Sequence, residues 1–82
     1  MELIALTPEK EIFNGPINSV KVPGVNGQFE ILNGHAPIVA ALAEGEVRIL
    51  DDNNQRTSFK IEKGFVEVLN NEVSLLIQSL VE

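Results

Sequence analysis

Turn-forming residue pairs recur along the whole chain, and they constrain the fold more than any other feature. Asn and Gly adopt the positive φ angles that tight hairpins need. Turns at intervals of about 8–12 residues with short apolar runs between them predict an all-β sandwich or barrel. The turn signals are Asn14-Gly15, Pro23-Gly24, Asn26-Gly27, Asn33-Gly34, Glu44-Gly45, Asp51 to Asn54, Lys63-Gly64 and Asn70-Asn71.

Apolar and polar residues alternate between these turns. A period of two residues places one face of each strand in the core and the other in water. Leu76 interrupts the alternation in the last such segment, which indicates a strand that is covered on both sides. The apolar members of the alternating segments are Val20 and Val22, Val47 and Ile49, Phe59 and Ile61, Val66 and Val68, and Val73, Leu75 and Ile77.

Residues 36–43 do not fit this pattern. Their sequence, APIVAALA, is rich in Ala, which favours a short helix. Pro37 near the start suits a helix or a strand. Because the segment is too short for its period to decide, helix and strand both remain open here.

The composition limits the classes of function. A chain of 82 residues with 44% hydrophobic residues predicts one folded domain spanning residues 1–82. The net charge of -6 argues against nucleic acid as a partner, since an acidic surface repels phosphate. The apolar runs are far shorter than the ~20 residues of a membrane span, so we expect no direct membrane insertion.

No catalytic or metal-binding constellation stands out. His35 is the only histidine and there is no cysteine, which makes a poor transition-metal site. Residues 51–62 partly match the spacing of an EF-hand, but Arg56 stands where that loop requires Gly. Phosphate-binding loop motifs are absent from the sequence. We therefore expect no enzyme activity, cofactor, metal or bound nucleotide, and we expect the four phenylalanines, Phe13, Phe29, Phe59 and Phe65, to pack in the core.

One stretch is more specific. The segment from Pro23 to Pro37 reads PGVNGQFEILNGHAP and resembles the signature P-G-x-x-G-x-F-G-I-L-P-G-H-A-P of the epsilon subunit of F-type ATP synthase. Glu30 and Asn33 depart from it, where the family usually has Gly and Pro. The resemblance extends over essentially the whole chain. Its other blocks are Thr7 to Lys10, Phe13 to Gly15, Ala41-Leu42, Gly45 to Val47, and Gly64 to Val68.

The resemblance implies a fold and a role. The fold is a flattened β-sandwich of two roughly five-stranded sheets. The role is that of a non-catalytic rotor subunit in the central stalk, which links the gamma subunit to the c-ring and couples proton transport to ATP synthesis. Such a subunit is peripheral, on the cytoplasmic face of the bacterial inner membrane as part of the complex.

The resemblance also implies where the partners bind. The c-ring interface of the family maps onto Gln28 and the turn Asn33, Gly34, His35 and Ala36. The gamma-facing surface is expected to be an apolar sheet face, which the sequence does not assign to residues.

Family members usually continue into a C-terminal pair of helices that inhibit rotation and, in some members, bind ATP. The sequence ends at Glu82, so we expect coupling without those two activities. A naturally short subunit and a piece of a longer one both remain open. Two other interpretations remain: an acidic β-sandwich that binds an unrelated protein, and a small enzyme that uses His35 with a carboxylate.

Overall fold

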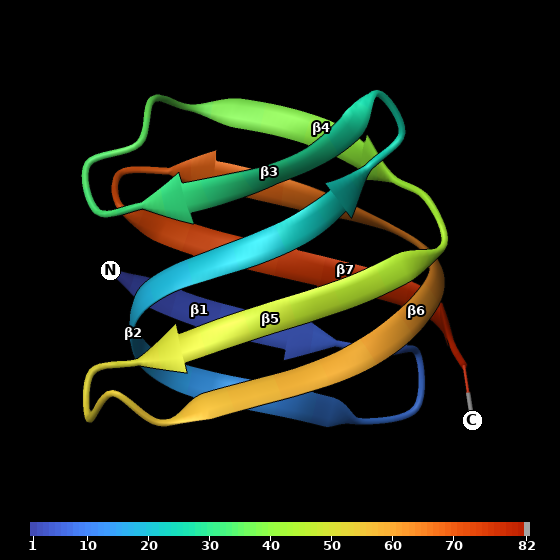
Figure 1. Cartoon of the computed structure of the whole chain (residues 1–82), viewed down its shortest axis with the longest axis horizontal. Helices are drawn as coiled ribbons and strands as arrows, with labels where there is room; N and C mark the ends of the chain where they lie inside the picture. Colours follow the sequence, from blue (N-terminus) through green and yellow to red (C-terminus); the bar gives the residue numbers. More distant parts are fainter. Residues whose placement is uncertain (82) are drawn as a thin grey trace.

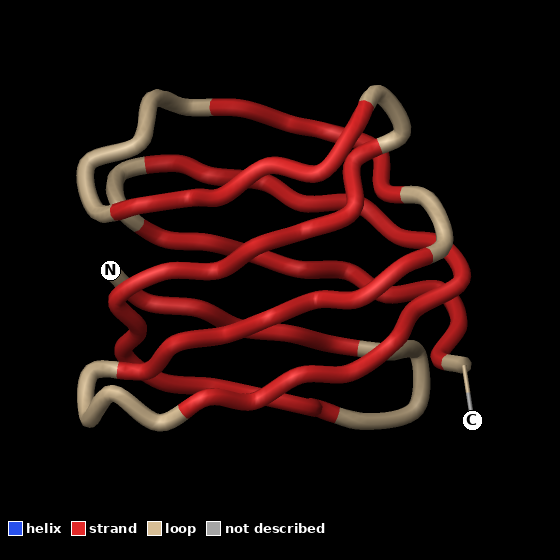
Figure 2. The backbone as a smooth tube through the Cα atoms, viewed as in Figure 1, coloured by secondary structure: helices blue, strands red, loops and turns tan. Residues whose placement is uncertain are grey.

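A computed structural model of the chain describes residues 1–81, and every regular element in them is a β-strand (Figures 1 and 2). The all-β prediction is therefore confirmed. Residues 36–43, where helix and strand were both open, contain the fourth strand. The strands are β1 (Glu2–Leu6), β2 (Glu11–Gly24), β3 (Gly27–Leu32), β4 (Ile38–Leu42), β5 (Gly45–Asp51), β6 (Arg56–Leu69) and β7 (Glu72–Leu80).

The strands form two stacked layers, because the long strands β2 and β6 bend and contribute to both. The front layer in Figure 1 contains β3, the second half of β2, β5 and the first half of β6. The back layer contains β4, the second half of β6, β7, β1 and the first half of β2. All pairs are antiparallel except β1 with β7. The layers match the expected pair of roughly five-stranded sheets, with four strands in the front layer.

The bends in β2 and β6 coincide with irregular pairing. In β2 the register shifts between Ile17 and Ser19, and in β6 it shifts between Ile61 and Gly64. Gly64 is buried at the second of these bends. A Cβ atom at Gly64 would lie 2.6 Å from the carbonyl oxygen of Leu76, so only glycine fits there without a backbone shift. A register shift of this kind marks an extra residue in one strand, a β-bulge, which bends the strand at the corner of a sandwich.

The core lies between the two layers, and the alternation seen in the sequence explains it. Of the apolar residues in the alternating segments, all are buried except Phe59, which is partly buried against the core. The expectation that the strand of Leu76 is covered on both sides is not met within the described residues. Leu76 is 50% exposed on the outer face of the back layer, and no described residue covers that face. The described residues contain no helix that is long and apolar enough to cross a membrane.

Candidate interaction surfaces

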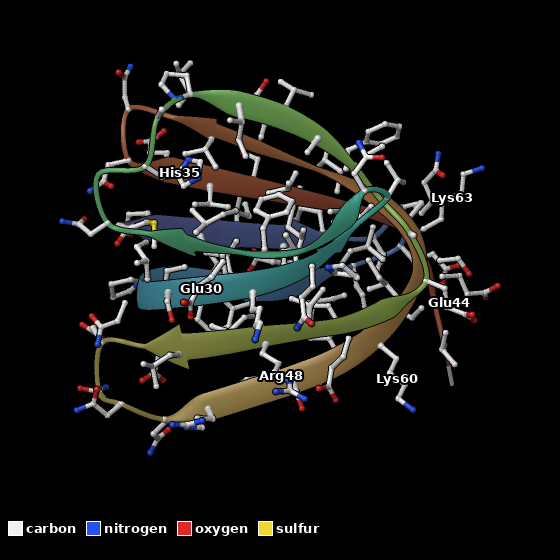
Figure 3. All side chains as sticks on the ribbon, turned by 45° about the horizontal axis from the view of Figure 1, so that its top comes forward. Glu30, His35, Glu44, Arg48, Lys60 and Lys63 are labelled. Atoms are coloured by element: carbon white, nitrogen blue, oxygen red, sulfur yellow. The ribbon has the colours of Figure 1, made fainter. Side chains whose placement is uncertain are left out.

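Residues 33–37, here called the His35 turn, carry the chain from β3 in the front layer to β4 in the back layer (Figures 1 and 3). Gly34 has a φ of 82°, which favours glycine. The His35 backbone N–H donates to the carbonyl oxygen of Leu32 at 3.1 Å. The His35 ring Nδ1 lies 2.7 Å from the carbonyl oxygen of Ala36, so Nδ1 carries the proton and donates it. The histidine thus stabilises its own turn.

The hairpin turn between β6 and β7 is hydrogen-bonded to the His35 turn. The Gly34 backbone N–H donates to Oδ1 of Asn71 at 2.9 Å. Nδ2 of Asn71 donates to Oδ1 of Asn33 at 2.7 Å. The backbone carbonyl oxygen of Asn71 also accepts from the N–H of Glu2 at 3.2 Å. Asn71 therefore connects the start of β1 to the His35 turn.

Gln28 lies apart from the His35 turn, at the opposite end of β3. It is the second residue of β3, whereas Asn33 follows the last. Five residue steps of extended strand between them span about 17 Å. The resemblance assigned all five residues to one interface, and the structure brings Asn33, Gly34, His35 and Ala36 together in one turn, away from Gln28. The rest of β3 lies between Gln28 and the His35 turn and keeps them apart.

The two places nevertheless lie along one side of the sandwich, which we call the β3–β4 edge: Val25, Gln28, Leu32, residues 33–36 and Val39. Figure 1 shows β3 and β4 next to each other along the top of the molecule. Gln28 lines a hollow of about 470 Å³ between the β2–β3 turn and β4. Val25 and Val39, on its two sides, are 58% and 73% exposed. The edge thus combines polar turns with exposed valines.

The outer face of the back layer carries a row of apolar side chains, which we call the apolar row: Ala41, Phe65, Leu76 and Leu6. The pairing places these residues side by side, since Ala41 is opposite Phe65, Phe65 is opposite Leu76, and Leu76 is opposite Leu6. Phe65 is 44% exposed, so the expectation that all four phenylalanines pack in the core is wrong for it. The interruption of the alternation at Leu76 was the sequence signal for this face.

The outer face of the front layer is polar instead. Lys21 lies opposite Glu30 on one side and Arg48 on the other, and Arg48 is paired with Glu46. Figure 3 labels Glu30 and Arg48. These residues line an open hollow of about 500 Å³. The hollow is an exposed charged surface rather than an enclosed site.

Two carboxylates, Glu46 and Asp51, are engaged with other groups. Glu46 binds Arg48, and Oδ1 of Asp51 accepts from the backbone N–H groups of Asn53 and Gln55 at 2.9 Å each. Asp51 thus shapes the β5–β6 turn where the EF-hand spacing was noted. Within residues 1–81, no group of three or more His, Asp or Glu side chains is placed to hold a metal ion.

Comparison with known proteins relates the whole chain to one family. The model of the family "ATP synthase, Delta/Epsilon chain, beta-sandwich domain" matches residues 1–82. An ATP synthase epsilon chain of Chlorobaculum tepidum is 45% identical, over 92% of this chain and 85% of its own length. That of Chlorobium limicola is 43% identical, over 96% and 90%. In Protochlamydia amoebophila the match is 38% identical and spans 53% of the relative.

Solved structures share the fold. A chain in the cryo-EM structure of the Euglena gracilis mitochondrial ATP synthase, comprising OSCP, F1 and c-ring, superposes with a TM-score of 0.88 at 21% identity, covering 96% of this chain and 51% of that one. A chain of the central stalk and c-ring of the Tetrahymena thermophila mitochondrial ATP synthase gives 0.83 at 22% identity, covering 100% and 66%. At these identities the likeness concerns the fold alone.

Proposed function

The chain belongs to the ATP synthase delta/epsilon family, and from this membership we propose that it is a non-catalytic rotor subunit of the central stalk. It links the gamma subunit to the c-ring and so couples proton transport to ATP synthesis. The observation that carries the proposal is the match of the family over residues 1–82, together with two epsilon chains that this chain covers over most of their length.

The gamma subunit binds the apolar row on the back layer. Two neighbouring large side chains, Phe65 and Leu76, are each about half exposed there. Apolar area that a partner removes from water favours association by roughly 25 cal/mol per Å². A flat, rigid sheet face also loses little conformational freedom on binding, which makes it suited to a permanent contact.

The c-ring binds the β3–β4 edge, through Gln28 at one end and Asn33, Gly34, His35 and Ala36 at the other. Of these, His35 is partly buried and the rest are exposed. Short turns offer backbone and amide groups that can pair with the polar loops of another protein. Two exposed valines, Val25 at the Gln28 end and Val39 on β4, supply apolar contact along the same edge.

The role is coupling rather than catalysis. Three side chains that could act as an acid or a base are already engaged in other contacts. His35 contacts the carbonyl of Ala36, Glu46 pairs with Arg48, and Asp51 accepts from turn amides. We place the subunit at the cytoplasmic face of the bacterial inner membrane, held there by the complex. We also propose that residues 1–82 act as a single domain.

Co-purification tests this function. The tagged chain is mixed with the gamma subunit and the c-ring of the same ATP synthase, separately and together. We expect the chain to be retained by gamma alone and to increase the recovery of gamma with the c-ring. Retention by neither partner would overturn the proposal and would favour the second interpretation, an acidic binding module with an unrelated partner.

A further inference from the structure

Asn71 uses both ends of its side-chain amide on a segment 37 to 38 residues away. Its Oδ1 accepts from the N–H of Gly34, and its Nδ2 donates to Oδ1 of Asn33. Both partners belong to the His35 turn. An amide that is held at both ends fixes the orientation of its target as well as its distance, because the donor and the acceptor cannot be exchanged without losing both bonds.

The His35 turn has little else to hold it. Gly34 carries no side chain, and a Cβ atom built on it would meet no other atom within 4 Å. Packing therefore does not restrict its backbone, and glycine has more conformational freedom than other residues. Besides the Asn71 bonds, the turn is held by two contacts of its own, from the N–H of His35 to Leu32 and from the His35 ring to Ala36.

Asn71 is held in a tight hairpin turn between β6 and β7. Leu69 pairs with Glu72, so Asn70 and Asn71 form a two-residue hairpin turn, with φ angles of 51° and 63°. Positive φ at both positions is typical of a type I′ turn, and Asn tolerates it better than most residues. The bond from the N–H of Glu2 to the carbonyl of Asn71 adds a second anchor.

We propose that Asn71 is a positioning residue that holds the His35 turn in the conformation that binds the c-ring. The β6–β7 hairpin thereby contributes to that interface through the His35 turn. The part of this inference that concerns the c-ring rests on the proposed function, whereas the part that concerns the His35 turn does not.

A matched pair of glycine substitutions tests it. Asn71→Gly keeps the positive φ and removes both side-chain bonds. Asn70→Gly makes the same change one residue earlier, where the side chain makes no hydrogen bond among the described residues. Asn71→Asp separates the two bonds, since its carboxylate still accepts from the N–H of Gly34 but cannot donate to Oδ1 of Asn33.

The two side-chain hydrogen bonds of Asn71 to the His35 turn are here called the clamp. Amide hydrogen exchange measured by NMR tests directly whether the clamp holds the turn. We expect the exchange of the Gly34 amide to accelerate about tenfold in Asn71→Gly, because this N–H loses the hydrogen bond that slows its exchange. It should stay within about twofold of wild type in Asn70→Gly and Asn71→Asp. An unchanged Gly34 amide in Asn71→Gly would refute the clamp, as would equal acceleration in both glycine variants.

Binding to the isolated c-ring tests whether the position of the His35 turn affects that interface. We expect a loss of affinity of about tenfold for Asn71→Gly, a smaller loss for Asn71→Asp, which keeps one of the two bonds, and affinity near wild type for Asn70→Gly. Faster exchange at Gly34 with unchanged binding would overturn the positioning role. A wild-type chain that does not bind the c-ring would overturn the proposed function instead, while the exchange measurement would still decide whether the clamp exists.

Discussion

Truncating Phe65 should weaken binding of the gamma subunit and leave the fold intact. Phe65 projects from the outer face of β6 and is 44% exposed. A phenylalanine presents roughly 200 Å² when fully exposed, so about 90 Å² remains for a partner to cover. At about 25 cal/mol per Å² this contact contributes about 2 kcal/mol to binding, which corresponds to about 30-fold in Kd.

Isothermal titration calorimetry of Phe65→Ala against purified gamma measures this loss. Leu32→Ala is the matched control, since Leu32 is 54% exposed but lies at the end of β3, on the β3–β4 edge. Its Kd for gamma should stay within about twofold of wild type. Circular dichroism of both variants checks that the sandwich is folded. An unchanged Kd for a folded Phe65→Ala chain would refute the assignment of the apolar row to gamma.

Three further predictions concern the fold and the β3–β4 edge. Gly64→Ala should destabilise the chain by about 2 kcal/mol in urea unfolding, because its Cβ would lie 2.6 Å from the Leu76 carbonyl; Gly15→Ala, where the nearest atom is 3.9 Å away, should be close to neutral, and equal losses would contradict the reason given. Leu75→Ala removes a side chain that is 0% exposed and should cost about 3 kcal/mol in the same assay; a loss under about 1 kcal/mol would mean that Leu75 is not in the core. His35→Glu should leave the circular dichroism spectrum unchanged and weaken pull-down of the c-ring, and unaltered pull-down would show that the ring binds elsewhere.

Much of the fold could be predicted from local sequence, because tight turns and alternating strands follow local rules. Asn70-Asn71 was predicted as a turn, and both residues have positive φ. Strand β4 could not be assigned, since its five residues are too few to distinguish a period of two from one of 3.6. Its pairing with β6 is a long-range interaction that no local pattern reveals.

The position of Phe65 shows why side-chain orientation was harder to predict. Phe59 and Phe65 are six residues apart, so an uninterrupted strand would place both on the same face. The irregular pairing between Ile61 and Gly64 adds one residue and reverses the alternation. Phe59 therefore packs against the core, and Phe65 points outward. The sequence signal was Lys63-Gly64, which reads as a turn but forms a bend within β6.

The geometry of the β3–β4 edge could be predicted only in part, because it too depends on contacts between residues far apart in the sequence. The resemblance named Gln28 and the His35 turn together, yet β3 separates them along the edge. The partner of the His35 turn, Asn71, is 38 residues from Asn33 in the sequence, and only the fold brings them into contact. A turn residue with positive φ gave no sign of a second role for its side chain.

Proton pumping driven by ATP hydrolysis tests directly whether the chain couples gamma to the c-ring. Membrane vesicles that carry the ATP synthase without this subunit are assayed with a pH-sensitive dye, before and after addition of the purified chain. We expect the chain to increase pumping for the same amount of ATP hydrolysed. Pumping that is equally coupled with and without the chain would contradict a role in linking gamma to the c-ring.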